Sequence, residues 1–467
     1  MQVIFPIAAA FLVRAGLGLA MFLISAWNLP VLQAHQVTLY RVMPDLPKVG
    51  GFWDFSPQSC YAHYFGSGIL NAWRTGGPFP DFSHADTEYY FFLAHLYRVV
   101  ESPIIGILAN AAMWALCTWF FCDLMKSMGL RSRVAAWLFA VWPSHILWST
   151  QLLKDSAVML FLLCALLIIS RWWRAFKIGL HGAVYTGLSS LSLFIALFWV
   201  FRLRAYAGIA LVLAITLAVV LQLFMRKPFL VKLTALCIAI TAFAAVRYAN
   251  HFSWSVEDVG RSLIVQERML DFKLEPLPTA EGVTFLERVI FNQRQAKKDR
   301  AHSTRRWHLE LTVPEWILYL TPRHVNNVRA GLVGTGGQSD ILPSLRFKRE
   351  LDVLAFLPTA GIIGVLAPFP AQWDPSAATT GAFRFFAGME TFVFYLFLPV
   401  IVLGAAWWWK AREMDVQVIV LFAVILAVVL GLYIPNAGTL FRLKMMWLAP
   451  AFCFLGAVIP STEEHER

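Results

Sequence analysis

The sequence predicts an all-α polytopic membrane protein with about ten transmembrane helices, because it combines very low charge with long apolar windows. Of the 467 residues, 59% are hydrophobic and only 14% are charged, whereas soluble domains carry roughly 25% charged residues. Several windows of about 20 residues are almost free of charge, long enough to cross a hydrocarbon core about 30 Å thick. Backbone polar groups must be paired within lipid, so we expect these windows to be helices.

The apolar windows succeed one another with short basic connections between several of them. The positive-inside rule assigns the connections near residues 126–133, 171–177, 226–232 and 410–412 to the cytoplasmic side. An even number of spans then separates consecutive basic loops, and both termini lie inside. The N-terminal window carries Arg14 and lacks a basic start, which indicates a retained first span. The expected spans are residues 4–29, 103–125, 134–150, 153–170, 182–200, 205–225, 229–249, 388–409, 415–434 and 440–459.

This topology divides the chain into three regions. Residues 1–249 form a membrane core with a first outer loop at 30–102, residues 250–387 form an outer loop region, and residues 388–467 form the C-terminal transmembrane helices. In the middle region, "LDVLAFLPTAGIIGVLAPFP" (351–370) is apolar but broken by prolines and glycines. The parity of the basic loops leaves no further crossing for it, so we expect a re-entrant or an interfacial segment. Residues 87–100 are apolar but too short to span, which favours a helix in the membrane interface.

Composition also bounds the partners and cofactors. The formal net charge of +11 does not indicate a nucleic-acid partner, because membrane proteins carry basic loops that face anionic headgroups. All cysteines except Cys60 lie in apolar windows, and no CxxC or Cys/His spacing indicates a metal. We therefore expect no cofactor from a motif, although a divalent metal is not excluded.

Several cations lie where the positive-inside rule would not place them. Arg202 and Arg204 occupy one outer helix end, and Arg442 and Lys444 occupy another. Arg14 lies inside the first span, where a charge costs about 2.5–3.5 kcal/mol to insert. Such charges suggest function, and arginine and lysine bind phosphate oxygens well. The alternatives are snorkelling to headgroups and structural ion pairs.

Lys154 and Asp155 interrupt two apolar runs with hardly room for a loop. We expect them at the tip of a tight helical hairpin at the outer membrane surface. In one interpretation they pair with each other, with headgroups or with the first outer loop, and so fix the tip. In the other, Lys154 contacts the phosphate of a lipid substrate.

Carboxylates come from the first outer loop. Asp54 follows a Gly-Gly-Phe-Trp turn and precedes an aromatic-rich stretch. A carboxylate at the membrane surface can take a proton from a sugar hydroxyl as general base, or it can cap a helix. Asp86 and Glu88 are candidates for a second carboxylate, although Asp86 could equally cap the helix expected at 87–100.

Taken in order, these features resemble the GT-C class of membrane glycosyltransferases, which includes protein O-mannosyltransferases, aminoarabinose transferases and polysaccharide-building relatives. The resemblance lies in the order of the features. One span is followed by a long outer loop with an early acidic residue, then by interfacial helices, "FLAHLYRVVESP" and a Lys-Asp tip. Three further segments are similar to parts of uncharacterised bacterial members of this class that are encoded near polysaccharide loci: "NAGTLFRLKMMWLAP", "VRAGLVGTGGQSDI" and "LAPFPAQW". The resemblance covers residues 1–210 and, more loosely, 320–460. The first loop has no clean Asp-x-Asp or Glu-x-Asp, which puts a divalent metal in doubt.

The resemblance implies a GT-C-like fold with interfacial helices in the first outer loop, and a polyprenyl-phosphate-linked sugar as donor. It implies Asp54 as the base and Arg202, Arg204 and Arg442 at the donor phosphate. The expected function is sugar transfer to a glycan, lipid or protein acceptor, outside the bacterial cytoplasmic membrane, in envelope or exopolysaccharide synthesis.

Three alternatives stay open: a polymerase of lipid-linked repeat units, a transporter or flippase for lipid-linked glycans, and a non-catalytic partner of other envelope-biosynthesis proteins. Transporters show internal repeats and polar sites near the midplane. The sequence has no evident repeat and its polar residues cluster at one face, which favours the enzyme.

Overall fold

The computed structural model describes residues 4–26, 57–77, 87–130, 132–177, 182–225, 228–251, 321–333, 340–373, 381–411 and 413–458. These residues are helical, with no strand among them and only an isolated bridge between Asp340 and Asn436. Nine helical segments of this described part are long and apolar enough to cross a membrane. The chain is therefore an α-helical multi-pass membrane protein, as the sequence predicts.

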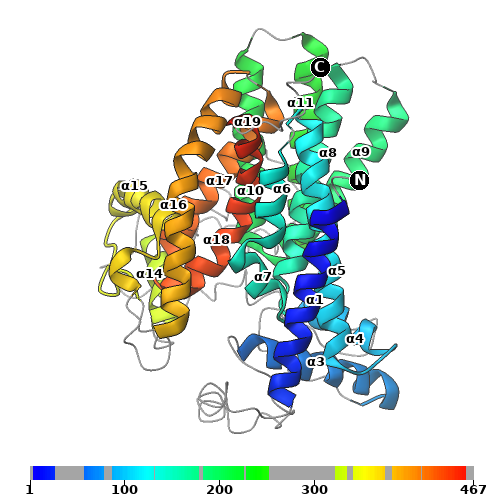
Figure 1. Ribbon diagram of the computed structural model, residues 1–467. Helices are drawn as coiled ribbons and strands as arrows, with labels where there is room; N and C mark the ends of the chain where they lie inside the picture. The colour runs from blue at the N-terminus through cyan, green and yellow to red at the C-terminus, as the bar shows by residue number, and fades with distance from the viewer. Residues whose placement is uncertain are drawn as a thin grey trace, which may run out of the picture. The chain divides into compact units, whose positions relative to one another are not determined.

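The chain divides into two compact units. The first contains residues 1–265, 373–426 and 445–467, and the second contains 266–372 and 427–444. Two helices, α17 (Met414–Tyr433) and α18 (Ala437–Ala451), contribute residues to both. The other helices of the first unit (Figure 1) are α1 (Ile4–Ala26), α3 (Pro57–Thr75), α4 (Thr87–Tyr97), α5 (Pro103–Ser127), α6 (Arg133–Val141), α7 (Pro143–Ser149), α8 (Asp155–Lys177), α9 (Ala183–Leu203), α10 (Ala205–Phe224), α11 (Phe229–His251), α16 (Gly381–Trp409) and α19 (Leu455–Val458).

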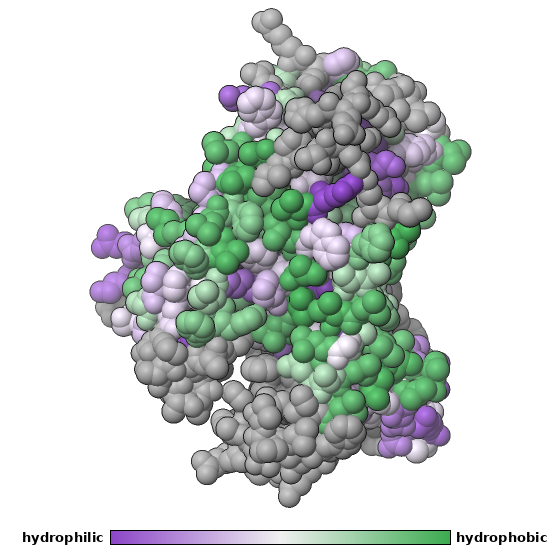
Figure 2. Space-filling model, viewed as in Figure 1, coloured by the Kyte–Doolittle hydropathy of each residue, from purple (hydrophilic) through white to green (hydrophobic). Residues whose placement is uncertain are grey.

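The centre of the first unit is α8, which packs between α5 and α9 and is buried over most of its length. By contrast, α9 and α11 carry exposed apolar side chains, including Val184, Leu188 and Ile240. Apolar side chains cover much of the face drawn in Figure 2. An exposed apolar surface of this extent fits helices that are solvated by lipid rather than by water.

One prediction about the spans is wrong. Residues 134–150 do not form a single helix but two short ones, α6 and α7, which meet at Trp142. The cause is Pro143, which has no backbone N–H and disfavours helical dihedrals at the residue before it. Trp142 accordingly adopts φ −60° and ψ 127°. The break leaves the last carbonyl groups of α6 without partners from the next turn.

The short helices α3 and α4 confirm the helices expected between the first two spans. They pack against each other through a core that includes Phe65, Ile69, Tyr90 and Leu93. Phe65 and Tyr90 stack with ring centroids 5.1 Å apart. His63 and Tyr97 share a hydrogen bond of 3.0 Å between the two helices. Burial there lowers the pKa of His63 and raises the pKa of Tyr97.

The second unit contains α14 (Pro322–Val333), α15 (Glu350–Leu366), a 3-10 turn at Pro370–Gln372 and residues 427–444. Its core joins Val325, Phe347, Val353, Ala360 and Leu432. The buried Arg329 guanidinium donates hydrogen bonds to three backbone carbonyls, those of Leu432, Ile341 and Leu342. The bond to Leu432 joins α14 to the last turn of α17, 103 residues later in the sequence.

Candidate functional site

Four charged side chains singled out from the sequence meet at one end of the first unit. Glu88 lies in the first turn of α4 and Asp155 begins α8. Arg202 lies in the last turn of α9, and Arg204 stands between α9 and α10. We call these four residues the charge cluster.

The charge cluster consists of two ion pairs. Arg202 pairs with Glu88, and their side chains are 6% and 16% exposed. Arg204 Nη2 lies 2.8 Å from Asp155 Oδ1, with side chains 17% and 0% exposed. The sequence indicated each charge but not the pairing, because the partners are 114 and 49 residues apart.

Helix ends favour three of the four charges. Glu88 and Asp155 lie at helix N-termini, where the macrodipole is positive, and Arg202 lies at a C-terminus, where it is negative. Arg204 is the exception, because it is both the C-cap of α9 and the N-cap of α10, so the two helix ends act on its charge in opposite directions. It donates a hydrogen bond to the buried Asp155 carboxylate.

The connection between α7 and α8, where the sequence predicts a tight hairpin tip, is buried. Lys154 is 6% exposed and Asp155 is 0% exposed. Asn110 of α5 holds the connection by donating to the carbonyls of Gln151 and Leu153, and it accepts a hydrogen bond from Tyr89 of α4. Buried backbone carbonyls need such partners, so Asn110 ties α4, α5 and the start of α8 together.

Asn110 is the residue of this region that sequence reasoning missed. A single asparagine inside the apolar window of α5 was the available signal, because polar side chains in membrane helices usually bond to neighbouring segments. Asp155 has a partner that neither sequence interpretation named, Arg204 between α9 and α10.

Two further candidate residues belong to the second unit. Arg442 and Lys444 are buried in the second unit, 8% and 4% exposed, and Lys444 Nζ donates to the carbonyl of Ala367 at 3.2 Å. Asp54 and Asp86 lie outside the residues that the structure describes. Among the described residues, no group of three or more His, Cys, Asp or Glu side chains could hold a metal ion.

Arg14 has a structural environment of its own. Its Nη1 donates to the carbonyl of Ala140 at 2.6 Å and its Nε donates to Ser149 Oγ at 2.7 Å. Its guanidinium carbon lies 4.7 Å from the centroid of the Trp114 ring. Arg14 thus bonds to the last turn of α6 and to the end of α7, on both sides of the break at Pro143. It supplies a donor to a carbonyl that the interrupted helix leaves open.

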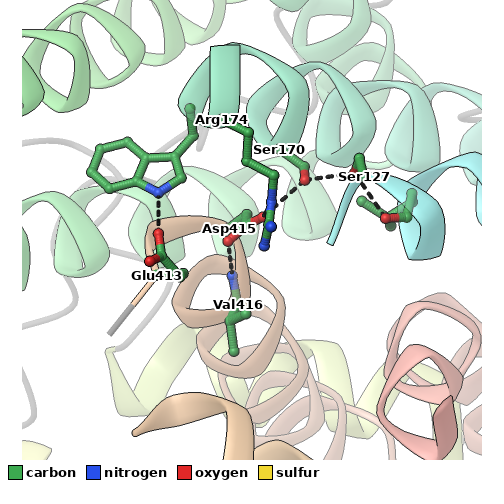
Figure 3. Close-up of polar contacts among 8 residues, drawn as sticks. Ser127, Ser170, Arg174, Glu413, Asp415 and Val416 are labelled. Atoms are coloured by element: carbon green, nitrogen blue, oxygen red, sulfur yellow. Dashed lines mark hydrogen bonds and ion pairs between the residues drawn. The ribbon is translucent and has the colours of Figure 1, made fainter. Parts of the chain in front are cut away.

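A third polar group, shown in Figure 3, fastens the start of α17 to α8. Asp415 Oδ2 accepts hydrogen bonds from Ser170 Oγ at 2.8 Å and from Arg174 Nε at 2.9 Å. Glu413 accepts a hydrogen bond from the indole of Trp173 at 2.8 Å. The basic connection at 171–177 belongs to this group, which explains why a buried carboxylate is tolerated there.

The buried ion pair leads to a stability prediction. Replacing Asp155 by alanine should lower the free energy of unfolding by about 3–5 kcal/mol, because Arg204 is then left without its carboxylate. Adding Arg204→Met should recover part of the loss. The matched control is Arg74→Ala, since Arg74 and Glu101 form an exposed pair with side chains 55% and 41% exposed. That control should cost under about 1 kcal/mol. Unfolding in detergent measures all three, and equal losses in the two single variants would contradict the prediction.

Comparison with protein-family models and with curated proteins gave no match to this chain.

Proposed function

We propose that the protein is a GT-C-type glycosyltransferase that moves a sugar from a polyprenyl-phosphate-linked donor to a glycan, lipid or protein acceptor. The reaction takes place on the outer face of the bacterial cytoplasmic membrane, in envelope or exopolysaccharide synthesis. The observation that supports this proposal is the charge cluster, which gathers carboxylates and guanidinium groups beside α4 at one end of a membrane helix bundle. An anionic lipid with an apolar tail presents its phosphate at the end of such a bundle.

In the proposed reaction, the oxygen of an acceptor hydroxyl forms a bond to the anomeric carbon of the donor sugar. Its proton passes to the Asp54 carboxylate, which acts as general base. The bond between the anomeric carbon and the phosphate oxygen breaks, and its electron pair leaves with the phosphate. Cationic donors stabilise the charge that develops there.

The guanidinium groups of the charge cluster suit a phosphate as well as a carboxylate. A guanidinium carries five N–H donors in a planar fork, so it can contact both kinds of oxygen. Arg204 is the more exposed of the two arginines, at 17% of its side chain, so we assign it the closer approach to the donor phosphate. Arg202 is the second proposed phosphate donor of the charge cluster, and Lys154 remains a candidate.

Sugar transfer by the purified protein in lipid vesicles tests the function. With a panel of polyprenyl-linked sugars, the wild type should transfer at least one sugar, and Asp54→Asn should reduce the rate on the order of 10²–10⁴-fold. Glu101→Gln is the control, because Glu101 is an exposed carboxylate paired with Arg74, and it should retain the rate.

If no donor supports transfer by the wild type, the enzyme proposal fails and movement of lipid-linked glycans across the vesicle should be measured next. If the wild type transfers but Asp54→Asn transfers equally well, the assignment of the base is wrong. In that case Glu88→Gln identifies whether the second carboxylate takes the proton, with unfolding in detergent measured alongside because Glu88 is paired with Arg202.

A further inference from the structure

The helix α15 has the composition of a membrane helix but not the length of a span. Its 17 residues rise about 25 Å, less than a hydrocarbon core of about 30 Å. Large apolar side chains point outward from it: Leu351, Leu354 and Ile362 are 71%, 54% and 55% exposed. Three large apolar side chains exposed on one short helix indicate contact with lipid.

The opposite face of α15 packs against the C-terminal part of α17 through small residues. A Cβ added to Gly364 would lie 1.8 Å from the carbonyl oxygen of Ala427, and one added to Gly431 would lie 1.9 Å from that of Ala360. Such close backbone approach is typical of helix pairs inside membranes. The contacts run in opposite directions: Ala360 meets Gly431, and Gly364, one turn later, meets Ala427.

The two ends of α15 lie in different surroundings. Before its first turn, Arg346, Lys348 and Arg349 are exposed, and the Asp352 carboxylate accepts backbone hydrogen bonds from Lys348 and Arg349 at 3.0 and 2.9 Å. These two bonds lower the pKa of Asp352, which keeps this exposed carboxylate charged. This end has the charge of a segment in water.

At the other end, the backbone is satisfied by the protein. Lys444 Nζ, two turns into α18, donates to the carbonyl of Ala367, the C-cap residue that follows α15. A cation is favourable at a helix C-terminus, where carbonyls lack partners. Beyond it, the Phe369 N–H donates to Gln372 Oε1 at 2.9 Å, and the Gln372 N–H donates to the Phe369 carbonyl at 2.7 Å. Irregular backbone is tolerated at membrane depth only with such partners.

We propose that residues 350–372 are a re-entrant segment, which enters the membrane from the outer face and returns to it without crossing. The positive-inside rule puts Lys410 in the cytoplasm, so α16, which precedes it, must begin outside and α17, which follows it, must end outside. Phe347 shares a core with Leu432 in the last turn of α17, which places the start of α15 outside as well. Lys444 and the small residues hold the inner end in place. The proposal stands whether or not the protein transfers a sugar.

Cysteine accessibility and depth together test this topology. Intact cells are treated with a membrane-impermeant maleimide after single substitutions at exposed positions: Lys348→Cys, Ala371→Cys and, as the cytoplasmic control, Lys410→Cys. The wild type measures the background from its own six cysteines. A re-entrant segment gives labelling at 348 and 371 but not at 410. If position 371 is labelled only after permeabilisation, like 410, α15 crosses the membrane and the proposal is overturned.

Depth separates a re-entrant segment from a helix that lies flat in the interface. Spin labels at Leu351→Cys and Ile362→Cys lie on the exposed face, about 16 Å apart along the helix axis. The ratio of accessibility to oxygen over an aqueous nickel complex should be several-fold higher at 362 than at 351. Equal ratios at the two positions would mean a flat interfacial helix. Lys444→Met should reduce the ratio at 362 if Lys444 holds the inner end, with the exposed Lys410→Met as the matched control.

Discussion

Replacing Arg14 by alanine should lower the free energy of unfolding by about 2–3 kcal/mol. The substitution removes the donor that bonds to the Ala140 carbonyl at the α6–α7 break. Leaving a buried acceptor without a hydrogen bond costs about 1–3 kcal/mol. It also opens a cavity over the Trp114 ring, which adds about 2–5 kcal/mol. Relief from holding a charge within the membrane returns about 2.5–3.5 kcal/mol, so at the midpoints of these ranges a net loss of about 2–3 kcal/mol remains.

Two further variants isolate the geometry of the guanidinium. Arg14→Lys keeps the charge but replaces a planar fork by a single ammonium group, so it cannot bond to Ala140 and Ser149 in the same way and should destabilise at least as much as alanine. Ser149→Ala removes only one acceptor and should cost about 1 kcal/mol. Reversible unfolding in mixed micelles gives all three values. A stability of Arg14→Ala within about 0.5 kcal/mol of wild type would show that the break at Pro143 does not depend on this residue.

The largest effect from a single methyl group is expected at Gly364. Its added Cβ would lie 1.8 Å from a backbone oxygen of Ala427, and neither backbone can move without separating α15 from α17. Gly364→Ala should therefore cost about 3 kcal/mol or more, at the upper end of the range for overpacking. Amide hydrogen exchange along α15 should rise together with the loss of stability, because the helix is released from its partner.

Gly361 provides the matched control on the same helix. A Cβ there would meet only Val428 Cγ2, at an ordinary contact distance of 3.4 Å. Gly361→Ala should be neutral, or stabilising by up to about 1 kcal/mol, because alanine has the higher helix propensity. If both substitutions leave stability and exchange unchanged, the close packing between α15 and α17 does not exist in the protein in lipid.

The membrane helices follow from the sequence because their cause is local. A window without charge must be helical in lipid whatever surrounds it, and eight of the nine observed spans begin within a few residues of an expected one, α16 being longer at its start. The prediction of a single helix over residues 134–150 is wrong because the effect of Pro143 overrides the tendency of an apolar window to be helical. The composition of the window favours a helix and Pro143 favours a break, and the proline decides the outcome.

The contacts of the charged residues could not be predicted in the same way. The sequence shows that Glu88, Arg202 and Asp155 carry charge in unusual places, but not which carboxylate meets which arginine. That depends on how α4, α8 and α9 pack, and packing of membrane helices is decided by small shape differences spread over the chain. The same holds for Asn110 and Arg14, because several of their partners are backbone carbonyls, which leave no mark in the sequence.

The bond between Asp415 and Ser170 also has a consequence for how the protein is made. The two residues are 245 positions apart, so at about 5–20 residues per second the ribosome reaches Asp415 about 12–50 s after Ser170. During that interval Ser170 and Arg174 lack the Asp415 carboxylate that accepts their hydrogen bonds. The first unit therefore cannot mature in the order of its synthesis: α8, inserted early, acquires its last partner only when α17 emerges.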